Sequence, residues 1–455
     1  MQYKSNIENI DIAPFYKYLD TNKMDIKDYQ VHGVKWAVDK EINGTQFIDN
    51  KETVIVKGGI IADEMGLGKT ILTIGIILSN IKRHTLIVLP LILVQQWYDV
   101  IYKTLGHKAL IYHGQDKKKI TFEKIKKAPI VITTYGTIAN RANSPLYRID
   151  WDRIIFDEAH HIKNKNTNAY MATLVLKTEV KWMVTGTPIQ NKIKDLQNIA
   201  NSIGVPYQVT YNEIERVNSI ILRRTKAQLG IKIATLNLHT NTVQWKNKKE
   251  KEMALQVHTS QESPLIRTIR AKQMCIYPHL IQNVYSQYFD QNTQYQSKIQ
   301  KVCQTIIQNK NGNKKIVFCQ FKREIDIIYS ILTQANINTK IIDGSTTIYK
   351  RSLILNDTEV NTIILQIQTA CEGLNLQQFN EIYFVSPHWN PAVEDQAIAR
   401  CHRIGQKKDV EVYKFIMDYI QKPIKEEDYL TYASMDLRCN NTQDVKRNIA
   451  NEILK

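Results

Sequence analysis

The sequence lacks the features that mark secreted, metal-binding or membrane proteins. Its six cysteines are scattered over 455 residues and contain no C-x-x-C pair. This argues against a zinc module and for a reducing compartment. The longest apolar run, residues 86–94, is far shorter than the roughly 20 residues of a membrane span. The N-terminal stretch MQYKSNIENIDI has no signal-peptide core, so an intracellular protein without membrane attachment is expected.

Composition places the chain among large globular proteins with a basic surface. Apolar residues make up 43% and charged residues 23% of the 455 residues, which excludes a disordered or fibrous protein and suits two or three domains. Lys and Arg number 61 against 44 Asp and Glu, giving a net charge of +17. This balance favours a nucleic-acid partner. The alternative is a generally lysine-rich solvated surface.

The strongest local motif is GGIIADEMGLGKT at residues 58–70. The apolar stretch before its turn predicts a buried strand, and the stretch after Thr70 predicts a buried helix. A strand, a glycine turn and a helix start form a phosphate cradle, in which Lys69 reaches the outer phosphates and Thr70 binds Mg²⁺. Asp63 stands where the usual pattern has glycine, so a Gly-rich turn with a chance lysine is the alternative.

Alternating apolar strands and helices surround this motif and predict an α/β fold with mostly parallel sheets and helices on both faces. Such sheets place ligands beyond the carboxyl ends of their strands. Strands are expected at residues 53–62, 85–89, 109–113, 130–134, 153–156 and 182–185, with helices at 93–102 and 167–176.

Two acidic residues, Asp157 and Glu158, come directly after the expected strand RIIF. In a phosphate-cleaving site, one carboxylate holds Mg²⁺ and a second orients or deprotonates the attacking water. Successive residues leave a strand on opposite sides, which suits Asp157 to the metal and Glu158 to the water. The alternative is two solvated acids in a loop. Thr185–Thr187 closes another strand, and its hydroxyls either sense the γ-phosphate or cap the next helix.

Two further candidates lie at the edges of this half. Gln30 carries an amide that can both donate to and accept from an adenine edge, although a surface glutamine on an amphipathic helix is the alternative. Arg223 and Arg224 form a candidate phosphate-contact pair, or else an exposed basic turn.

The second half repeats the alternation without a phosphate loop of its own. Helices are expected at residues 298–308, 324–332 and 392–403, with strands at 315–321, 339–343, 362–368, 381–386 and 410–415. Arg400 and Arg403 stand near the end of the last of these helices. Without further context they read as cations favourably placed at a helix C-terminus.

Taken together and in order, the motifs resemble those of the Swi/Snf-type ATPases of the superfamily-two helicase group. The compact, Asn/Ile/Lys-rich chain is similar to the motor-only members of large DNA viruses, the global-transactivator type. The matching segments are DYQ (28–30), DEMGLGKT (63–70), TTYGT (133–137), DEAHHIKN (157–164), VTGTPIQN (184–191), LRRTK (222–226), VFCQF (317–321), DGSTT (343–347), EGLNL (372–376) and SPHWNPAVEDQAIARCHRIGQ (386–406).

The resemblance implies two RecA-like lobes with ATP in the cleft between them. The implied organisation is a loosely ordered lead-in over 1–24, lobe one over 25–226, a helical hinge over 227–263, lobe two over 264–430 and a tail over 431–455. Ala370 and Cys371 replace two glycines that the family often has, and His388 replaces a common tryptophan. No added reader module is expected within these residues.

The resemblance also implies roles for individual residues. The catalytic set is Lys69, Asp157 and Glu158, with Arg400 and Arg403 as arginine fingers. Mg²⁺ is expected on Thr70 and Asp157. The ATP-binding set is Gln30 as the adenine reader, Asp63, Glu64, Met65, Gly66, Leu67, Gly68, Lys69, Thr70, Gly373 and Gln396. The DNA-binding set is Thr133, Thr134, Arg223, Arg224, Thr369, Asn375 and Trp389, with a core position as the alternative for Trp389.

The sequence therefore predicts an ATP-driven double-stranded DNA translocase that remodels protein–DNA complexes, with ATP and Mg²⁺ as cofactors. Nucleosomes or a transcription complex are candidate substrates. A monomer, or a chain recruited by a partner protein, is expected in the nucleus or a viral factory. Two alternatives stay open: a strand-separating DNA or RNA helicase, and a non-catalytic DNA-binding regulator on a helicase fold.

Overall fold

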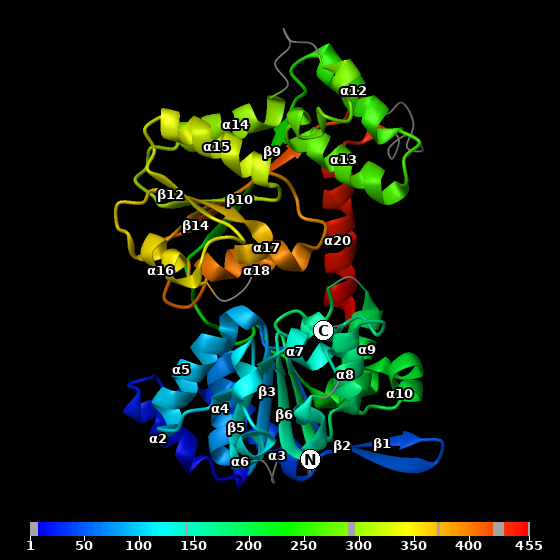
Figure 1. The fold of residues 1–455 in the computed structure, drawn as a ribbon, viewed down its shortest axis with the longest axis vertical. Helices are drawn as coiled ribbons and strands as arrows, with labels where there is room; N and C mark the ends of the chain where they lie inside the picture. The colour runs from blue at the N-terminus through cyan, green and yellow to red at the C-terminus, as the bar shows by residue number, and fades with distance from the viewer. Residues whose placement is uncertain are drawn as a thin grey trace. The chain divides into compact units, whose positions relative to one another are not determined.

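The chain divides into two compact units, Met1–Lys232 with Ile449–Lys455 and Ile233–Asn448. The computed structural model describes residues 8–141, 144–190, 192–289, 296–370, 374–421 and 432–453. Each unit has its own sheet, as the ribbon in Figure 1 shows. Each also has its own two clusters of buried hydrophobic residues. We call the two units unit 1 and unit 2.

Unit 1 is built on an eight-stranded sheet in the order β1-β2-β7-β6-β3-β5-β4, with β8 paired to β2. Only the β1–β2 pair is antiparallel among the described strand pairs of this sheet. Its central strands are runs of buried β-branched residues, as strands covered on both faces require. The strands are β1 (Thr45–Asp49), β2 (Glu52–Ile61), β3 (Thr85–Leu89), β4 (Leu110–Ile111), β5 (Ile130–Thr134), β6 (Trp151–Asp157), β7 (Thr178–Val184) and β8 (Ile221–Leu222).

Helices cover both faces of this sheet. Successive residues of β6 enter different cores: Ile154 and Phe156 join one hydrophobic cluster, and Ile155 joins the other. Figure 1 draws α4 and α5 on one side of the strands and α8 and α9 on the other. The helices are α2 (Ala13–Thr21), α3 (Asp28–Ile42), α4 (Lys69–Ser79), α5 (Val94–Leu105), α6 (Phe122–Lys127), α7 (Tyr135–Ala139), α8 (Asn168–Val175), α9 (Ile193–Ile203), α10 (Tyr207–Asn212) and α11 (Ile214–Val217).

Unit 2 contains a six-stranded sheet in the order β11-β12-β10-β13-β14-β9. All of its described strand pairs are parallel. The strands are β9 (Leu236–Val243), β10 (Lys315–Cys319), β11 (Thr339–Ile342), β12 (Thr362–Gln366), β13 (Glu381–Phe384) and β14 (Val410–Met417).

Helices again lie on both faces of the second sheet. In β10, Ile316 and Phe318 join one cluster, whereas Val317 and Cys319 join the other. Figure 1 shows α14 and α15 on one side of the strands and α16 and α18 on the other. The helices are α12 (Lys248–His258), α13 (Pro264–Ile276), α14 (Ser297–Gln308), α15 (Lys322–Gln334), α16 (Ile348–Asn356), α17 (Ile367–Ala370), α18 (Pro391–Cys401) and α20 (Met435–Ile453). The residues of α20 from Ile449 onward belong to unit 1.

The predicted fold class is confirmed: both units are α/β, with mostly parallel sheets between helical layers. The expectation of a loosely ordered N-terminal segment is wrong for Ala13–Thr21, which forms α2. Phe15 and Leu19 of this helix are fully buried in a core of unit 1. They stand four residues apart, a helical spacing that brings both onto one face. None of the described helices is both long and apolar enough to cross a membrane.

Candidate functional site

The phosphate-loop motif lies at the carboxyl end of β2 and opens α4. Gly66 and Gly68 both have positive φ, 90° and 83°, a conformation that glycine adopts without steric cost. Gly68 is the N-cap of α4, and Lys69 is its first residue. The helix N-terminus therefore follows a tight glycine turn, as an anion-binding cradle requires.

Lys69 lies between the loop and the segment that follows β7. Its Nζ donates to the Asp63 carbonyl oxygen at 3.0 Å. A Cβ placed on Gly186 would meet Lys69 Nζ at 3.0 Å and the Met65 side chain at 2.8 Å. Because Gly186 has no side chain, the Thr185–Thr187 segment can lie close to Lys69. Thr185 N–H donates to the Ile61 carbonyl at 3.0 Å, which ties the segment to the end of β2.

Asp157 ends β6 and is held by aromatic residues of unit 1. Trp97 Nε1 donates to Asp157 Oδ2 at 2.8 Å, and Tyr135 hydroxyl donates to the Asp157 carbonyl at 2.7 Å. Burial, followed by the neighbouring Glu158 carboxylate, raises the pKa of Asp157 to about 7. The hydrogen bond from Trp97 and the charge of Lys69 oppose this rise. A second cation beside Asp157 would stabilise its ionised form.

Glu158 has a left-handed backbone, with φ of 51°. Such a conformation in a non-glycine residue is uncommon and tends to cluster at functional sites. Its Oε2 lies 3.4 Å from His160 Nδ1, and the same nitrogen lies 3.4 Å from Thr185 Oγ1. His160 therefore connects the acid to the segment after β7.

These residues fit a nucleotide and a hard divalent cation. Among the described residues, no cluster of three or more His, Cys, Asp or Glu could hold a metal. Thr70 and Asp157 offer oxygen ligands, which Mg²⁺ prefers, and Mg²⁺ typically uses few protein ligands together with substrate phosphates. The glycine cradle, Lys69 and the raised pKa of Asp157 agree with a triphosphate and a cation between them.

Gln30 and the two arginines of LRRTK lie beside the phosphate loop. Gln30 is buried, and its Nε2 donates to the Leu67 carbonyl at 3.2 Å. Arg224 donates to the Asp63 carboxylate and to the Tyr29 carbonyl. A DNA-phosphate contact from this guanidinium would require breaking those bonds. Arg223 is half-buried, and burial lowers its pKa while Glu64 opposes that shift.

Thr133 and Thr134, predicted as DNA contacts, are buried at the end of β5. Thr133 hydroxyl donates to the Tyr112 carbonyl at 2.8 Å. Thr134 Oγ1 caps α7 by accepting from Thr137 N–H at 3.3 Å. Both hydroxyls thus have partners inside the protein, and Gly136 is the exposed residue of this turn.

Unit 2 carries the predicted arginine fingers at the end of α18. Arg400 is in its last turn, Arg403 follows two residues after the helix, and both are half-buried. Burial and then the charge of Arg400 lower the pKa of Arg403, so the two guanidinium groups repel one another. A polyanion would relieve that repulsion. Gln396, one turn earlier, is buried, and Gly373 lies outside the described residues.

The predicted DNA-contact residues of unit 2 differ in exposure. Trp389 is 42% exposed, so the core position considered for it is not observed. Asn375 is exposed, whereas the Thr369 side chain lies outside what the structure describes. Lys446 of α20 donates to the Trp389 carbonyl at 2.9 Å, and its Nζ lies 5.9 Å from the centre of the Trp389 ring.

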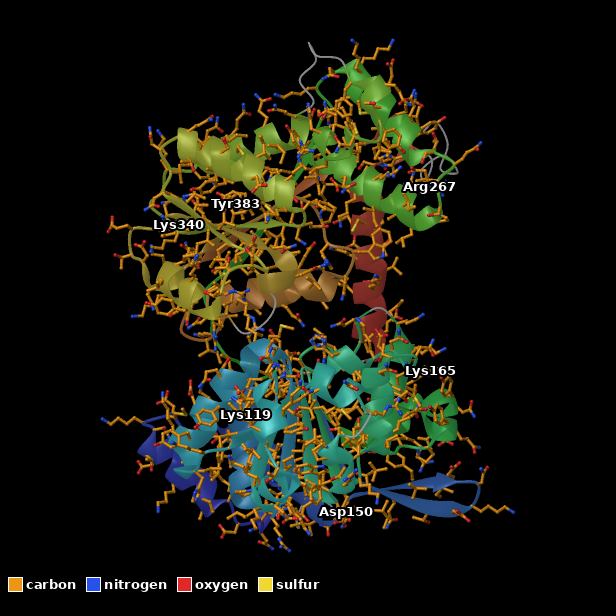
Figure 2. All side chains as sticks on the ribbon, viewed as in Figure 1. Lys119, Asp150, Lys165, Arg267, Lys340 and Tyr383 are labelled. Carbon is orange, nitrogen blue, oxygen red and sulfur yellow. The ribbon has the colours of Figure 1, made fainter. Side chains whose placement is uncertain are left out.

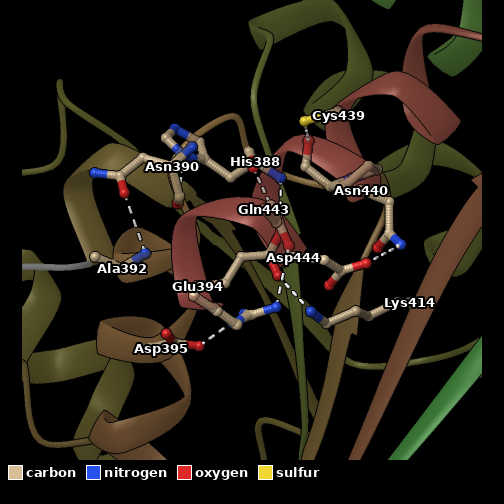
Figure 3. A network of polar contacts seen from close by, with 12 residues as sticks. His388, Asn390, Ala392, Glu394, Asp395, Lys414, Cys439, Asn440, Gln443 and Asp444 are labelled. Carbon is tan, nitrogen blue, oxygen red and sulfur yellow. Dashed lines mark hydrogen bonds and ion pairs between the residues drawn. The ribbon is translucent and has the colours of Figure 1, made fainter. Parts of the chain in front are cut away.

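A buried polar network fixes the turn that carries Trp389 (Figure 3). Glu394 accepts from His388 N–H at 2.6 Å, Gln443 Nε2 at 2.7 Å and Lys414 Nζ at 2.5 Å. Gln443 also donates to the His388 carbonyl. Helix α20 thereby joins the turn to α18 and β14.

The structure thus gathers Gln30, Lys69, Asp157 and the Thr185–Thr187 segment at one edge of the first sheet. Arg400, Arg403 and Trp389 belong to the other unit. Sequence reasoning missed three residues that support this edge, which are Trp97, Tyr135 and Tyr29. Trp97 stands in an amphipathic helix where any core residue would fit the pattern, so only the fold reveals its bond to Asp157.

The family model of the SNF2-related domain matches residues 29–374. A protein described as a probable global transactivator of Orgyia pseudotsugata multicapsid polyhedrosis virus is 26% identical over 92% of this chain and 93% of its own length. The ATP-dependent DNA helicase DDM1 of Arabidopsis thaliana is 25% identical, over 86% of this chain and 58% of that protein. The ISWI chromatin-remodeling complex ATPase ISW2 of Saccharomyces cerevisiae is 25% identical, over 90% of this chain and 40% of that protein.

Among solved structures, the Sulfolobus solfataricus SWI2/SNF2 ATPase core in complex with dsDNA covers 95% of this chain and 96% of its own, at 23% identity and a TM-score of 0.43. The chain spans nearly all of the viral relative but only about half of the plant and yeast relatives. The family match extends over most of the chain, and it includes the phosphate loop and the two acids at the end of β6, Asp157 and Glu158. The chain therefore belongs to the SNF2-related family of helicase-like, DNA-dependent ATPases.

Proposed function

We propose that this protein is an ATP-driven translocase on double-stranded DNA that remodels protein–DNA complexes without needing to separate the strands. One observation carries the proposal. The phosphate cradle, Lys69 and the Asp157–Glu158 pair meet at one sheet edge, within a chain of the SNF2-related family. ATP hydrolysis at that edge would supply the energy for movement.

The chain's own residues have distinct proposed tasks in hydrolysis. The N–H groups at the start of α4 and Lys69 bind the phosphates, Gln30 reads the adenine, and Glu158 orients or deprotonates the attacking water. His160 keeps Glu158 in place through the 3.4 Å contact. When bound through Thr70 and Asp157, Mg²⁺ would neutralise charge that develops on the phosphate oxygens.

Arg400 and Arg403 are the proposed arginine fingers. Their mutual repulsion supports an anionic ligand at the end of α18. An arginine finger contributes about 10³–10⁵ to the rate in related phosphoryl-transfer enzymes. Arg223, Asn375 and the exposed Trp389 remain the proposed DNA contacts, together with the backbone around Thr133 and Thr134 and the segment around Thr369.

The proposed partners are inferred from the charge of the chain and from the names of its relatives. The net charge of +17 supports a polyanionic partner. A chromatin-remodelling ATPase and a viral global transactivator are among the similar proteins. We propose that the chain acts as a monomer, or is recruited by a partner protein, in a nucleus or viral factory.

A triplex-displacement assay beside a forked-duplex assay tests the proposal. We expect ATP-dependent displacement of a third strand from duplex DNA, with no unwinding of the fork. Lys69→Ala and Glu158→Gln should each reduce turnover at least 100-fold, because they remove phosphate binding and water activation. Both should keep duplex binding.

Lys177→Ala is the matched control, since the Lys177 side chain is 70% exposed and forms a surface ion pair with Asp150. Efficient fork unwinding would instead indicate a strand-separating helicase. Turnover unchanged in Lys69→Ala would overturn the ATPase site, and duplex binding without any turnover in the parent protein would indicate a non-catalytic regulator.

A further inference from the structure

Residues 221–226 run beside the first half of the phosphate loop and are hydrogen-bonded to it. Strand β8 pairs in parallel with the end of β2. Beyond that pairing, Ala62 N–H donates to the Leu222 carbonyl at 2.7 Å, and Glu64 N–H donates to the Arg224 carbonyl at 2.9 Å. The backbone pairing therefore continues past the end of β2, and the bond from Glu64 lies beyond the end of β8 as well.

Side chains add further bonds between this segment and the phosphate loop. Lys226 N–H donates to Glu64 Oε2 at 2.7 Å, and Lys226 Nζ lies 2.9 Å from Glu64 Oε1. Lys226 stands six residues before the end of the continuous part of unit 1 at Lys232. The last segment before the chain enters unit 2 is thus fastened to the start of the phosphate loop.

Arg224 makes the central connection between this segment and the phosphate loop. Its Nε donates to Asp63 Oδ1 at 2.9 Å, and one terminal nitrogen donates to Asp63 Oδ2. The other terminal nitrogen donates to the Tyr29 carbonyl. The Asp63 side chain is 1% exposed and that of Arg224 13% exposed. This two-point pairing of a guanidinium with a carboxylate fixes orientation as well as charge.

The N-terminal end of α3 completes the connection on the other side. The Arg224 guanidinium lies 5.3 Å from the centre of the Tyr29 ring. Tyr29 hydroxyl and Gln30 Nε2 both donate to the Leu67 carbonyl, at 3.1 and 3.2 Å. Arg224 therefore joins the first residue of the loop, Asp63, to the helix that holds its later part at Leu67.

Gly33 leaves the space that this arrangement needs. A Cβ at this position would lie 2.8 Å from a terminal nitrogen of Arg224 and 2.7 Å from Leu72 Cδ1. Both distances are shorter than real Cβ contacts, so an added methyl group would displace the Arg224 guanidinium or the Leu72 side chain. Because Gly33 has no side chain, the Arg224 guanidinium fits against α3.

We propose that Arg224 is a positioning residue for nucleotide binding, which sets the shape of the phosphate loop by holding Asp63 and α3 together. This inference rests on the proposed ATPase function. It also explains why an aspartate stands at position 63, where a plain phosphate loop has glycine. The carboxylate is the anchor for Arg224, so the loop gains its shape from a distant segment as well as from its own glycines.

Loss of the guanidinium would leave the Asp63 carboxylate buried without its partner beside the phosphate site. A buried carboxylate in that position is destabilising and repels the triphosphate. Arg224→Ala should therefore weaken equilibrium binding of a fluorescent ATP analogue in the absence of DNA by more than tenfold. The KM for ATP should rise by a similar factor, while kcat at saturating ATP stays within about threefold.

Two further variants separate positioning from simple loss of structure. Arg224→Lys keeps the charge but lacks the two-point geometry, so it should give an intermediate affinity. Gly33→Ala removes no charged group, but it should also weaken nucleotide binding because the added methyl group displaces the Arg224 guanidinium. Arg216→Ala is the matched control, because Arg216 forms a half-exposed ion pair with Glu213 away from the loop. Its affinity should equal that of the parent protein.

Lys69→Ala distinguishes failure of this inference from failure of the proposed function. If Lys69→Ala loses nucleotide binding while folded Arg224→Ala and Arg224→Lys bind as the parent does, the positioning role is overturned. If Lys69→Ala also binds nucleotide unchanged, the ATP site itself is misassigned. Thermal unfolding of each free variant shows whether it is folded, and Arg224→Lys serves the test if Arg224→Ala does not fold. A fall in kcat with unchanged KM and affinity would also overturn the proposal.

Discussion

His258 connects two helices of unit 2 through its two ring nitrogens. Nδ1 lies 2.7 Å from the Ala254 carbonyl, and Nε2 accepts from Met435 N–H at 3.0 Å. The ring must therefore be neutral, with its proton on Nδ1. Burial lowers the pKa of His258 to about 4. The hydrogen bond to Ala254 opposes this shift, and the nearby charge of Arg438 adds a smaller lowering effect.

This residue makes stability dependent on pH. The unfolded chain binds a proton at His258 near pH 6.5, whereas the folded protein binds it only near 4. Stability from the neutral ring is therefore complete above about pH 6.5 and is lost as pH falls toward 4. The loss is on the order of 3 kcal/mol for such a shift. Urea unfolding at pH 7, 6 and 5 measures it.

His258→Gln supplies the control for this prediction. Glutamine does not titrate, so the variant should be less stable at pH 7 but should lose less stability between pH 7 and 5 than the parent protein. An equal acid-induced loss in both proteins would show that other groups dominate the pH response of unit 2.

At the level of single residues, the sequence predicts the residues that take part in the chemistry. It is a poorer guide to the residues that hold them in position. Lys69, Asp157 and Glu158 stand in motifs whose spacing implies phosphate chemistry. Trp97, Tyr135 and Arg224 reach their partners across at least 22 residues of chain, and up to 195 residues for Arg224 and Tyr29. Such pairs form through the sheet topology, which local patterns do not contain.

At the level of elements, helix α20 depends on the buried amide of Gln443. This side chain donates to Glu394 Oε1 and to the His388 carbonyl, next to Trp389. Gln443→Ala would leave both buried acceptors with one donor fewer, which costs about 1–3 kcal/mol. We expect reduced DNA-stimulated ATP turnover, because the turn that presents Trp389 loses support, with nucleotide affinity unchanged.

ATPase rates with and without duplex DNA, beside urea unfolding, measure this effect. Gln334→Ala is the matched control, since Gln334 is exposed at the end of α15 and should change neither quantity. Full DNA stimulation in a destabilised Gln443→Ala would mean that α20 contributes stability alone.

Elements with strong apolar patterns are predictable from the sequence. Strands β3 and β5 match the predicted ranges 85–89 and 130–134, and the other expected helices and strands differ mainly at their ends. The prediction of a helical hinge over 227–263 is wrong for Leu236–Val243, which forms β9 and pairs with β14. Its sequence LNLHTNTV is polar and lies at the sheet edge. An edge strand shows little of the buried alternation on which such prediction depends.

At the level of the whole molecule, the net charge of +17 implies strongly salt-dependent DNA binding. A protein that makes 6–10 phosphate contacts loses about 10³–10⁵ in affinity between 50 and 200 mM salt. We expect at least a 100-fold loss for a 30-base-pair duplex, measured by fluorescence anisotropy without nucleotide. A response of less than about threefold would show that the excess lysine lies away from the DNA and serves only as a solvated surface.

The buried thiols have a practical consequence for measuring the distance between the two units. All five described cysteines are buried, and burial raises the pKa values of Cys275, Cys303 and Cys439 to about 12. Maleimide dyes react with thiolates, so these groups would stay unlabelled in the folded protein. With Cys371 replaced, new cysteines at Lys119 of unit 1 and Lys340 of unit 2, both exposed and labelled in Figure 2, would take a donor and an acceptor dye. The distance between the units could then be followed by energy transfer through each ATP cycle, without removing the native core cysteines.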